Sequence, residues 1–437
     1  MNIVVFGAGY VGLSTASCFA EMGNKVSCVD IDNNKIEKLS KGQIPLYEPG
    51  LEDFIKRNLK VGRLSFTTDS KKAIEEAEVI FCAVGTPPKK DYQPDTEQVE
   101  QVAKDVGKYM NGYKVFVIKS TVPIGTTKKC KAIIQKELSE RNVDHEFDVA
   151  FNPEFLRQGE ALNDTINPNR IILGIDNEEP VKLLSKLYYP ILRTGKPLMF
   201  TDLCSAEVTK YAANAFLSTK ISFINELAHL CEKTGGNIKD VAQGIGLDPR
   251  IGHQFLNAGI GYGGSCLKKD VQALIHHAKK HNHEFKLLQA VEDINERQKT
   301  VLIDKLLSNI PTLENKKIAL WGLTFKPKTD DMRDAPSLQI IEQLKMHNAD
   351  IHVYDPIQKD LPDVVHSANS LEAAKDADAL LILTEWEEFK GVDLKKLKTA
   401  MKGNLILDGR NMYDQKAAKQ EGFRYVGIGI TQPQEFD

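Results

Sequence analysis

The chain has 437 residues, of which 42% are hydrophobic and 27% charged, with a formal net charge of −3. This length exceeds that of one ordinary hydrophobic core, so we expect two or three globular domains. The near-neutral charge creates no field that favours nucleic acid or an anionic membrane, so neither is an expected partner. We also expect no signal peptide, because the opening residues MNIVVFGAG contain no basic segment, and no apolar run approaches the length of a membrane span.

The cysteine pattern argues against stabilisation by disulfides or metals. Seven cysteines form an odd number and include no C-x-x-C pair. We therefore expect neither a disulfide framework nor a structural zinc site, and a reducing cytoplasm is the expected compartment.

A dinucleotide-binding pattern opens the chain. An apolar strand over residues 3–6 is followed by G-x-G-x-x-G and a helical pattern, and a second strand over 25–29 ends at an aspartate. The glycines let the backbone approach a pyrophosphate, which a helix N-terminus attracts. The aspartate can accept hydrogen bonds from a ribose diol and would repel a 2′-phosphate, so the predicted cofactor is NAD. The residues expected to hold it are Gly7, Gly9, Tyr10, Val11, Gly12, Asp30 and Lys35.

Polar residues follow the later strands of this first sheet. Thr86 follows the strand of residues 78–85, Thr121 follows that of 114–120, and Glu154 follows residues 149–151. The carboxyl ends of parallel strands border one cleft, so we expect these three side chains to face the cofactor. Two alternatives stay open: a proline-terminated loop at Thr86 and a solvated carboxylate at Glu154.

A helical pattern from Ser205 to about Thr234 is long enough to connect two domains. Lys210 and Asn214 lie four residues apart and therefore project from one face of this helix. Such a polar stripe is either a solvated edge or the wall of a site.

A glycine-rich segment, GIGYGGSCLKKD, covers residues 259–270. Its glycines would let a ligand approach the backbone. Cysteine reacts as the thiolate, which nearby cations such as Lys268 and Lys269 would stabilise. Asp270 is expected to cap the helix that follows. The alternative is a turn that holds an inert Cys266.

A second βαβ pattern begins at Lys316 and repeats the first, with Asp355 at the position that corresponds to Asp30. This copy lacks the glycine triplet. Cations follow its strands instead, at Lys326, Arg333 and Arg410. They would suit a nucleotide diphosphate, or they are ordinary surface cations.

The motifs together resemble those of the UDP-glucose 6-dehydrogenase family, within the wider group of nucleotide-sugar dehydrogenases. The segments that carry the resemblance span the chain: GAGYVG, LYEPGL, STVPIGTT, NPEFLRQG, EVTKYAANAFLSTKISFINE, DPRIG, FLNAGIGYGGSCLKKD and TFKPKTDD. The resemblance implies an α/β fold of two Rossmann-like, doubly wound domains joined by a long central helix. It also implies an NAD-binding domain over 1–200, a helical dimerisation domain with the cysteine loop over 201–300, and a UDP-sugar-binding domain over 301–437.

The chemistry implied by the resemblance is a four-electron oxidation, with NAD, of the C6 alcohol of UDP-glucose to UDP-glucuronate. A cysteine forms a thiohemiacetal and then a thioester, which water cleaves. The catalytic residues implied are Cys266, Lys210, Asp270, Asn214, Glu154 and Thr121, of which Thr121 and Glu154 also adjoin the cofactor. The substrate-binding residues implied are Phe155, Leu156, Lys210, Asn214, Arg250, Phe255, Tyr262, Gly263, Lys326 and Arg410.

The family pattern also implies a homodimer built on the long helix, because Arg250 matches an arginine that reaches across such an interface. Three residues depart from the pattern: Gln158 replaces a frequent glutamate, Asn257 a frequent lysine and Lys268 a frequent proline. Asn257 and Lys268 leave open a dehydrogenase of another UDP-sugar, such as a UDP-N-acetylhexosamine. A further alternative, from another class, is a non-catalytic nucleotide-sugar sensor with the same fold.

Overall fold

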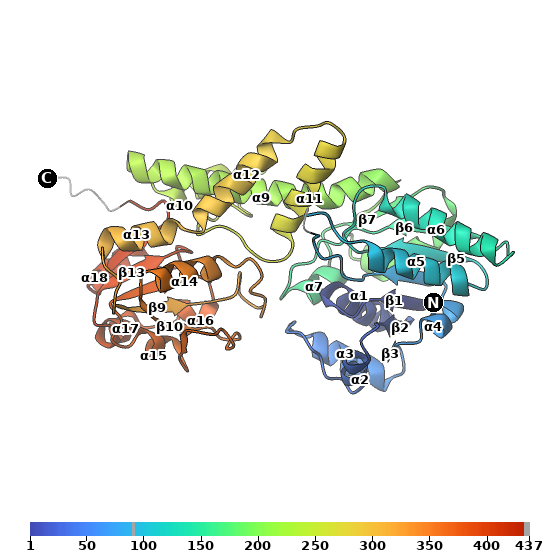
Figure 1. Cartoon of the computed structure of the whole chain (residues 1–437), viewed down its shortest axis with the longest axis horizontal. Coiled ribbons are helices and arrows are strands. Elements are labelled where there is room, and N and C mark those ends of the chain that lie inside the picture. The colour runs from blue at the N-terminus through green and yellow to red at the C-terminus, as the bar shows by residue number, and fades with distance from the viewer. Residues whose placement is uncertain (90–91, 432–437) are drawn as a thin grey trace. The chain divides into compact units, whose positions relative to one another are not determined.

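The computed structural model describes residues 1–89 and 92–431. The chain divides into two compact units. The first comprises Met1–Ala213 with Gln272–His281, and the second comprises Asn214–Val271 with the residues from Asn282 onward. Each unit contains one β-sheet with helices on its faces (Figure 1).

The sheet of the first unit has eight strands in the order β3-β2-β1-β4-β5-β6-β7-β8. Neighbouring strands are parallel except β6 and β7, which are antiparallel. The strands are β1 (Asn2–Phe6), β2 (Lys25–Val29), β3 (Leu64–Thr67), β4 (Val79–Cys82), β5 (Lys114–Ile118), β6 (Phe147–Phe151), β7 (Ile171–Ile175) and β8 (Leu198–Asp202). The helices between them are α1 (Tyr10–Glu21), α2 (Asn33–Ser40), α3 (Leu51–Lys60), α4 (Ser70–Glu76), α5 (Glu97–Tyr109), α6 (Thr126–Glu140), α7 (Ala161–Ile166) and α8 (Glu179–Leu192).

The sheet of the second unit has six strands, all parallel, in the order β11-β10-β9-β12-β13-β14. The strands are β9 (Lys317–Trp321), β10 (Asp350–Tyr354), β11 (Val365–His366), β12 (Ala379–Ile382), β13 (Leu405–Asp408) and β14 (Arg424–Gly427). The helices of this unit are α10 (Ile238–Gly246), α12 (Lys286–Gln298), α13 (Val301–Asn309), α14 (Pro336–Met346), α15 (Ser370–Ala374), α16 (Glu387–Lys390), α17 (Leu394–Ala400) and α18 (Gln415–Gln420). Helices α9 (Leu203–Thr234) and α11 (Leu267–Lys280) contribute residues to both units.

The two sheets share one strand order over six strands, which confirms the α/β class and the predicted repetition of a doubly wound architecture. Both faces of each sheet are buried. In β1, Ile3 and Val5 join one apolar core, whereas Val4 and Phe6 join another on the opposite face. Burial on both faces explains why these strands are continuous apolar runs in the sequence.

A tight turn follows the first strand of each sheet. Gly7 has a φ of +98°, and a Cβ on it would lie 2.5 Å from the carbonyl oxygen of Ala83, so only glycine fits there. Gly322 after β9 has a φ of +88°, and a Cβ there would lie 2.4 Å from the Cβ of Thr384. In both sheets the turn after the first strand therefore passes so close to the end of the neighbouring strand that no side chain fits between them.

An aspartate closes each of these turns. The carboxylate of Asp30 accepts a hydrogen bond of 2.8 Å from the backbone N–H of Ala8. In the second sheet, Asp355 accepts a bond of 2.8 Å from the N–H of Leu323. The predicted correspondence of the two aspartates is thus confirmed by their matching contacts.

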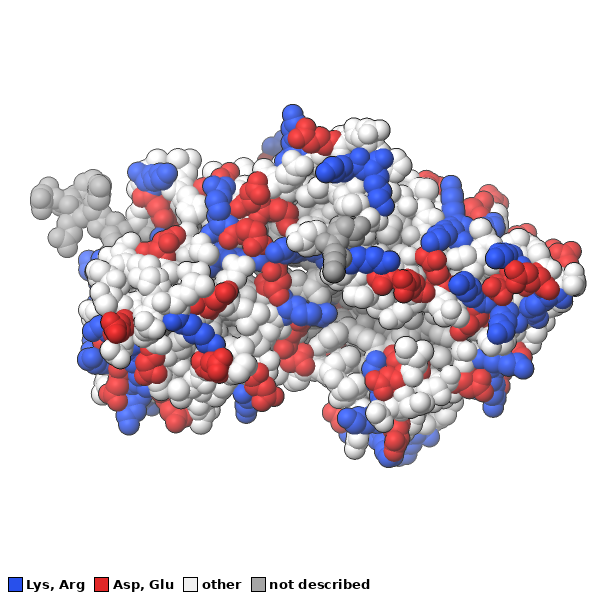
Figure 2. All heavy atoms as spheres, in the orientation of Figure 1, with Lys and Arg blue, Asp and Glu red and all other residues white. Residues whose placement is uncertain are grey.

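Two surface features complete the description. Basic and acidic side chains are interspersed on the face in Figure 2, in agreement with the formal net charge of −3. Across the described residues, no helix is both long enough and apolar enough to cross a membrane.

We predict that Gly12→Ala lowers the free energy of unfolding by about 1–3 kcal/mol, the usual range for overpacking a tight contact. A Cβ on Gly12 would lie 1.7 Å from the carbonyl oxygen of Gly7, which belongs to the rigid turn after β1. The measurement is urea unfolding. Gly9→Ala is the matched control, because a Cβ there meets no atom within 4 Å; equal losses of stability for the two variants would contradict this account of the turn.

Candidate functional site

The turn after β1 has the features that a dinucleotide requires. Helix α1 begins without a side-chain cap and without an acidic residue in its first turn. Such a helix N-terminus carries partial positive charge and attracts an anion such as a pyrophosphate. Gly9, the residue before the helix, leaves open space where a side chain would stand.

The Asp30 carboxylate lies beside this turn. Its Oδ2 atom accepts from the N–H of Ala8 and from Lys35 Nζ at 3.1 Å, and its Oδ1 atom accepts from the N–H of Asp32. Burial alone would raise the pKa of Asp30, but the two amides and the Lys35 ammonium hold this pKa below its usual range. The carboxylate therefore stays ionised and can accept hydrogen bonds from the hydroxyls of a ribose. The residues of this turn fit NAD.

Thr86 and Thr121 lie together at the carboxyl ends of β4 and β5. Both are buried, and the hydroxyl of Thr86 donates a hydrogen bond of 2.8 Å to the carbonyl oxygen of Thr121. The ends of these two strands therefore lie side by side. That Thr86 and Thr121 face the cofactor stays a prediction.

Glu154, in the loop after β6, is buried and forms an ion pair with Lys210 of α9. The distance from Lys210 Nζ to Glu154 Oε1 is 2.8 Å, and both side chains are less than 10% exposed. The second carboxylate oxygen accepts from the N–H of Leu156 at 2.7 Å. Glu154 is therefore not the solvated loop carboxylate that the sequence allowed.

A second lysine, Lys119 at the end of β5, approaches the same pair. It is buried, and its ammonium donates to Asn152 Oδ1 at 2.8 Å, an atom that also accepts from the hydroxyl of Tyr188 at 2.7 Å. Burial lowers the pKa of Lys119 to about 8, although Glu154 favours its charged form. Lys119 was not among the predicted site residues; its only signal in the sequence is a lysine near the end of the segment KVFVIKS.

The charges of this cluster determine the state of Glu154. Burial acts to raise the pKa of Glu154, but the ammonium of Lys210, the N–H of Leu156 and the ammonium of Lys119 outweigh burial and hold the pKa below its usual range. A buried carboxylate thus remains ionised between two buried lysines. One carboxylate and two ammonium groups leave an excess of positive charge, which favours a negatively charged group nearby.

Phe155 follows Glu154 and contributes an aromatic wall. The guanidinium of Arg170 lies 3.7 Å from the centre of the Phe155 ring, and Lys210 Nζ lies 5.8 Å from it. These cation–π contacts hold the ring beside the ion pair. Leu156, the next residue, is half-buried.

Asn214 and Asp270 meet in the second unit. The amide of Asn214 donates to Asp270 Oδ2 at 2.6 Å, and the Asp270 side chain is 1% exposed. The prediction that Asp270 caps the following helix is wrong. Helix α11 begins three residues earlier, at Leu267, and the N–H of Asp270 already bonds to the carbonyl oxygen of Cys266 within its first turn. The glycine-rich segment gave no reason to start the helix before the aspartate.

Cys266 is exposed and immediately precedes α11. The partial positive charge of a helix N-terminus stabilises negative charge placed there. The other cysteines have a different environment: burial raises the pKa of Cys18 and Cys82 to about 12, for example, which makes them inert. Cys266 combines solvent access with a position that favours the thiolate.

The glycines before Cys266 pack against protein atoms. A Cβ on Gly263 would lie 2.3 Å from the carbonyl oxygen of Asp334, and one on Gly264 would lie 2.8 Å from the ring of Phe325. The N–H of Gly264 also donates to the carbonyl oxygen of Arg333 at 2.8 Å. The loop needs these glycines in order to lie directly against the segment between β9 and α14.

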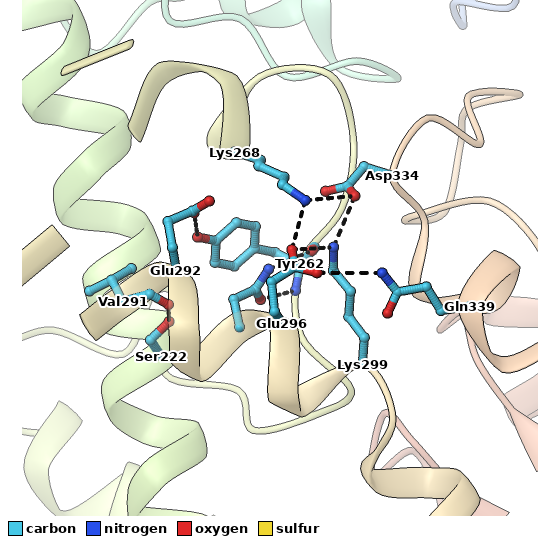
Figure 3. A network of polar contacts seen from close by, with 10 residues as sticks. Ser222, Tyr262, Lys268, Val291, Glu292, Glu296, Lys299, Asp334 and Gln339 are labelled. Atoms are coloured by element: carbon cyan, nitrogen blue, oxygen red, sulfur yellow. Dashed lines mark hydrogen bonds and ion pairs between the residues drawn. The ribbon is translucent and has the colours of Figure 1, made fainter. Parts of the chain in front are cut away.

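A charged network anchors the same loop (Figure 3). Lys268 donates to Glu296 at 2.7 Å and lies 3.5 Å from Asp334, whereas Lys299 lies 3.0 Å from Glu296 and 2.9 Å from Asp334. Tyr262, within the loop, donates its hydroxyl to Glu292 at 2.8 Å. The sequence suggested Lys268 only as a cation near Cys266, because these two ionic partners lie 28 and 66 residues away.

Two side chains of the second sheet that were predicted to bind a nucleotide, Lys326 and Arg410, both interact with other residues of the chain. Arg410, after β13, donates to the carbonyl oxygens of Leu383 at 2.9 Å and Gly261 at 3.1 Å. It therefore also supports the cysteine loop. Lys326 lies in the β9–α14 loop with its Nζ 5.8 Å from the ring of Phe325.

Arg250 and Phe255 lie between α10 and α11. The side chain of Arg250 is 87% exposed and pairs with Asp248 at 2.5 Å. Phe255 is half-buried and has a φ of +64°, a left-handed conformation that is costly for an aromatic residue.

Three successive domains of one protein family match the chain. The NAD binding domain of the UDP-glucose/GDP-mannose dehydrogenase family matches residues 1–192, its central domain matches 204–297 and its UDP binding domain matches 319–415.

Relatives and solved structures agree with this match. The UDP-glucose 6-dehydrogenase TuaD of Bacillus subtilis (strain 168) is 45% identical over 98% of this chain and 93% of its own length, and the UDP-glucose 6-dehydrogenase of Rhizobium meliloti is 43% identical over 98% and 99%. A UDP-glucose dehydrogenase structure from Pyrobaculum islandicum has a TM-score of 0.88 at 34% identity, covering 98% of this chain and 97% of that one. The structure of UDP-D-ManNAc dehydrogenase from Pyrococcus horikoshii has a TM-score of 0.86 at 30% identity, covering 98% and 99%. The chain belongs to the UDP-glucose/GDP-mannose dehydrogenase family.

Proposed function

We propose that this protein is an NAD-dependent UDP-glucose 6-dehydrogenase that converts UDP-glucose to UDP-glucuronate. The observation that carries the proposal is the exposed Cys266 at the N-terminus of α11, with the buried Asp270 one turn further along that helix. An alcohol dehydrogenase without a thiol would stop at the aldehyde, whereas a thiol provides a route to the acid. The names of relatives that are 43–45% identical support the same reaction.

The cysteine accounts for the second half of the reaction. The Cys266 thiolate attacks the aldehyde carbon, an S–C bond forms and the carbonyl oxygen takes up a proton, which gives a thiohemiacetal. NAD, when bound, accepts the hydride lost in each of the two oxidations. Water then attacks the resulting thioester, the C–S bond breaks, and the thiol and the acid are released. Asp270 is the group placed to orient that water and accept its proton.

The buried cations stabilise the charge that develops on oxygen during these steps. Lys210 is held in place by Glu154, so its ammonium is already oriented for an alkoxide or a tetrahedral oxyanion. Asn214, bonded to Asp270, adds an amide donor on the next turn of α9. Thr121, which lies beside Thr86 at the ends of β4 and β5, helps to position the attacking water in our proposal.

The three segments of the chain take separate tasks in this proposal. Residues 1–200 bind NAD through the turn after β1, and residues 201–300 carry the cysteine loop and the dimer contacts. Residues 301–437 bind the uridine diphosphate, with Lys326 and Arg410 near its phosphates. Phe155, Leu156, Phe255, Tyr262 and Gly263 form the wall around the sugar. None of the seven cysteines, all of which lie in the part of the chain that the structure describes, forms a disulfide, and we infer a reducing, cytoplasmic location.

An apolar stripe on α9 supports a homodimer. Phe216, Phe223 and Leu230 recur every seven residues, and their exposed fractions are 65%, 54% and 54%. Regular exposure of large apolar side chains along one helix is characteristic of an interface between helices. Lys220 donates to the carbonyl oxygen of Ile251 at 3.0 Å, so the loop that carries Arg250 lies beside this stripe. Arg250 would thereby reach the sugar site of the partner subunit.

The central prediction concerns stoichiometry and Cys266. Purified protein should produce two NADH for each UDP-glucose consumed, and Cys266→Ser should abolish net formation of the acid because the thioester cannot form. The measurement is NADH absorbance together with chromatography of the sugar nucleotides. Cys204→Ser is the matched control, since Cys204 is only half-buried but lies within α9.

A panel of UDP-sugars separates the alternatives. Turnover of a UDP-N-acetylhexosamine but not of UDP-glucose would replace the proposed substrate, and one NADH per sugar would remove the second oxidation. Binding of UDP-sugars without any turnover would favour the sensor. Unchanged acid formation by Cys266→Ser would exclude the thiol from the mechanism.

The buried ion pair gives a prediction on stability. Lys210→Met should lower the free energy of unfolding by about 3–5 kcal/mol, as expected when one partner of a buried pair is removed. Lys210→Met with Glu154→Gln should recover most of that loss, because no unpaired carboxylate then remains. Urea unfolding of the two single variants and the double variant measures the coupling; additive effects would show that the pair is not coupled.

The same variants have a defined pH dependence. The folded-state pKa of Glu154 is depressed, so the stability it contributes is present above the pKa of an unfolded glutamate and is lost as the pH falls through the folded pKa. In Lys210→Met the folded-state pKa of Glu154 rises, because the ammonium that lowers it is gone. The loss of stability on acidification that Glu154 causes should therefore become smaller or change sign. Unfolding series in acid and at neutral pH would test the sign.

The dimer proposal predicts that Phe216→Glu with Phe223→Glu converts the protein to monomers, because charges replace two exposed apolar side chains of the stripe. Sedimentation equilibrium gives the mass. Met346→Glu is the matched control, since Met346 is 65% exposed and belongs to a different helix, α14. A monomeric wild type, or an unchanged mass for the double variant, would contradict the proposed interface.

A further inference from the structure

The cysteine loop is attached to its surroundings by charge as well as by backbone. Figure 3 shows four charged side chains that meet in one cluster: Lys268 of α11, Glu296 of α12, Lys299 immediately after α12, and Asp334 before α14. Each ammonium contacts both carboxylates, at distances of 2.7 Å and 3.5 Å for Lys268 and 3.0 Å and 2.9 Å for Lys299. We refer to these four residues as the charge cluster.

The charge cluster is shielded from water unevenly. The Lys299 side chain is 0% exposed, and the Lys268 side chain is 26% exposed. Burial would raise the pKa of Glu296, but Lys268 and Lys299 lower it to about 2. Glu296 is therefore ionised at neutral pH, and partial burial protects its ion pairs from screening by salt.

The residues of the charge cluster come from three segments with different tasks. Lys268 is two residues after the proposed nucleophile Cys266, whereas Asp334 ends the β9–α14 loop that carries Lys326. Glu296 and Lys299 belong to α12 and its end, which also holds Tyr262 through Glu292. The charge cluster thus joins the first turn of α11 to the loop proposed to bind diphosphate.

Close backbone contacts beside the charge cluster require that the cysteine loop be placed accurately against the β9–α14 loop. Asp334 has a φ of +53°, and its carbonyl oxygen lies where a Cβ of Gly263 would be, 2.3 Å away. Gly264 bonds to the neighbouring Arg333 carbonyl. Only a loop held firmly against this segment keeps such close contacts, and Lys268 is the side chain of α11 that provides the ionic attachment.

We propose that Lys268 is a positioning residue for Cys266: through Glu296 and Asp334 it holds the first turn of α11 against the β9–α14 loop. The proposal rests on the assignment of Cys266 as the nucleophile. Lys268 touches neither substrate nor cofactor in this role. Its loss moves the thiol relative to a sugar nucleotide held by the β9–α14 loop, while the residues that bind the nucleotide are unchanged.

The test compares Lys268→Met, Lys268→Arg and Lys305→Met. Lys305 is the matched control, because it is also mostly buried, pairs with Glu232 at 2.7 Å and belongs to the same unit. A displaced nucleophile should lower kcat of Lys268→Met by about 10- to 100-fold, with KM for the UDP-sugar within about twofold of the wild type. Lys268→Arg, which keeps the charge, should restore most of kcat, and Lys305→Met should behave as the wild type.

A second measurement does not depend on turnover. Alkylation of Cys266 by iodoacetamide, followed by mass spectrometry of its peptide, reports the environment of the thiol directly. The alkylation rate should change by about threefold or more in Lys268→Met and stay near the wild-type rate in Lys268→Arg and Lys305→Met. If no UDP-sugar is oxidised by the wild type, this readout still tests the placement of Cys266 while the proposed function alone is rejected.

Several results would overturn the proposal. They are an unchanged kcat and alkylation rate in Lys268→Met, equal damage from Lys268→Arg, or the same damage from Lys305→Met. Asp334→Asn provides an independent variant of the same contact, because it removes the charge with little change of shape, and it should reproduce the pattern of Lys268→Met. Equal melting temperatures of the variants exclude a loss of folding as the cause.

Discussion

The structure depends on a turn that has no room for a side chain. After the first strand of each sheet, Gly7 and Gly322 adopt a positive φ and pass so close to the neighbouring strand that a Cβ would collide with it. Asp30 and Asp355 then bind the amide that follows the glycine. This repeated arrangement fixes where the strand ends and where the site begins.

The two copies diverge in what they leave for a ligand. Asp30 is bound by two amides and Lys35 near an uncapped helix N-terminus, which suits a ribose and a pyrophosphate. Asp355 is 2% exposed and also accepts a hydrogen bond of 3.2 Å from the indole N–H of Trp386. Its carboxylate therefore bonds to protein groups. In our proposal the second sheet binds its ligand through cations from its loops instead, and one of these cations, Arg410, also donates to the carbonyl oxygen of Gly261 in the cysteine loop.

Much of this architecture was predictable because its signals are local. The pattern from Gly7 to Asp30 is contained in one βαβ unit, and Lys210 and Asn214 are adjacent on one helix. The start of α11 was not predictable, because the turn from Ser265 to Asp270 depends on packing of the glycines against Phe325 and Asp334. The antiparallel β7 likewise depends on long-range pairing, which no short apolar run encodes.

Contacts between charged residues distant in sequence were also hidden. Lys119 reads as the polar end of a strand, yet it is buried beside Asn152 and influences Glu154. Residues such as Lys268, Glu296 and Asp334 have the composition of an ordinary solvated surface. Only the fold brings Lys268 to 2.7 Å from Glu296 and 3.5 Å from Asp334.

The distribution of the cysteines has a practical consequence. Five of the seven are buried, Cys204 is half-buried and Cys266 is exposed, all within the described residues. A bulky maleimide dye or spin label should therefore attach to the native chain at one position without any cysteine being removed. The protein carries a built-in reporter at the N-terminus of α11, and the signal of that reporter would follow the local motion of the glycine-rich loop in solution.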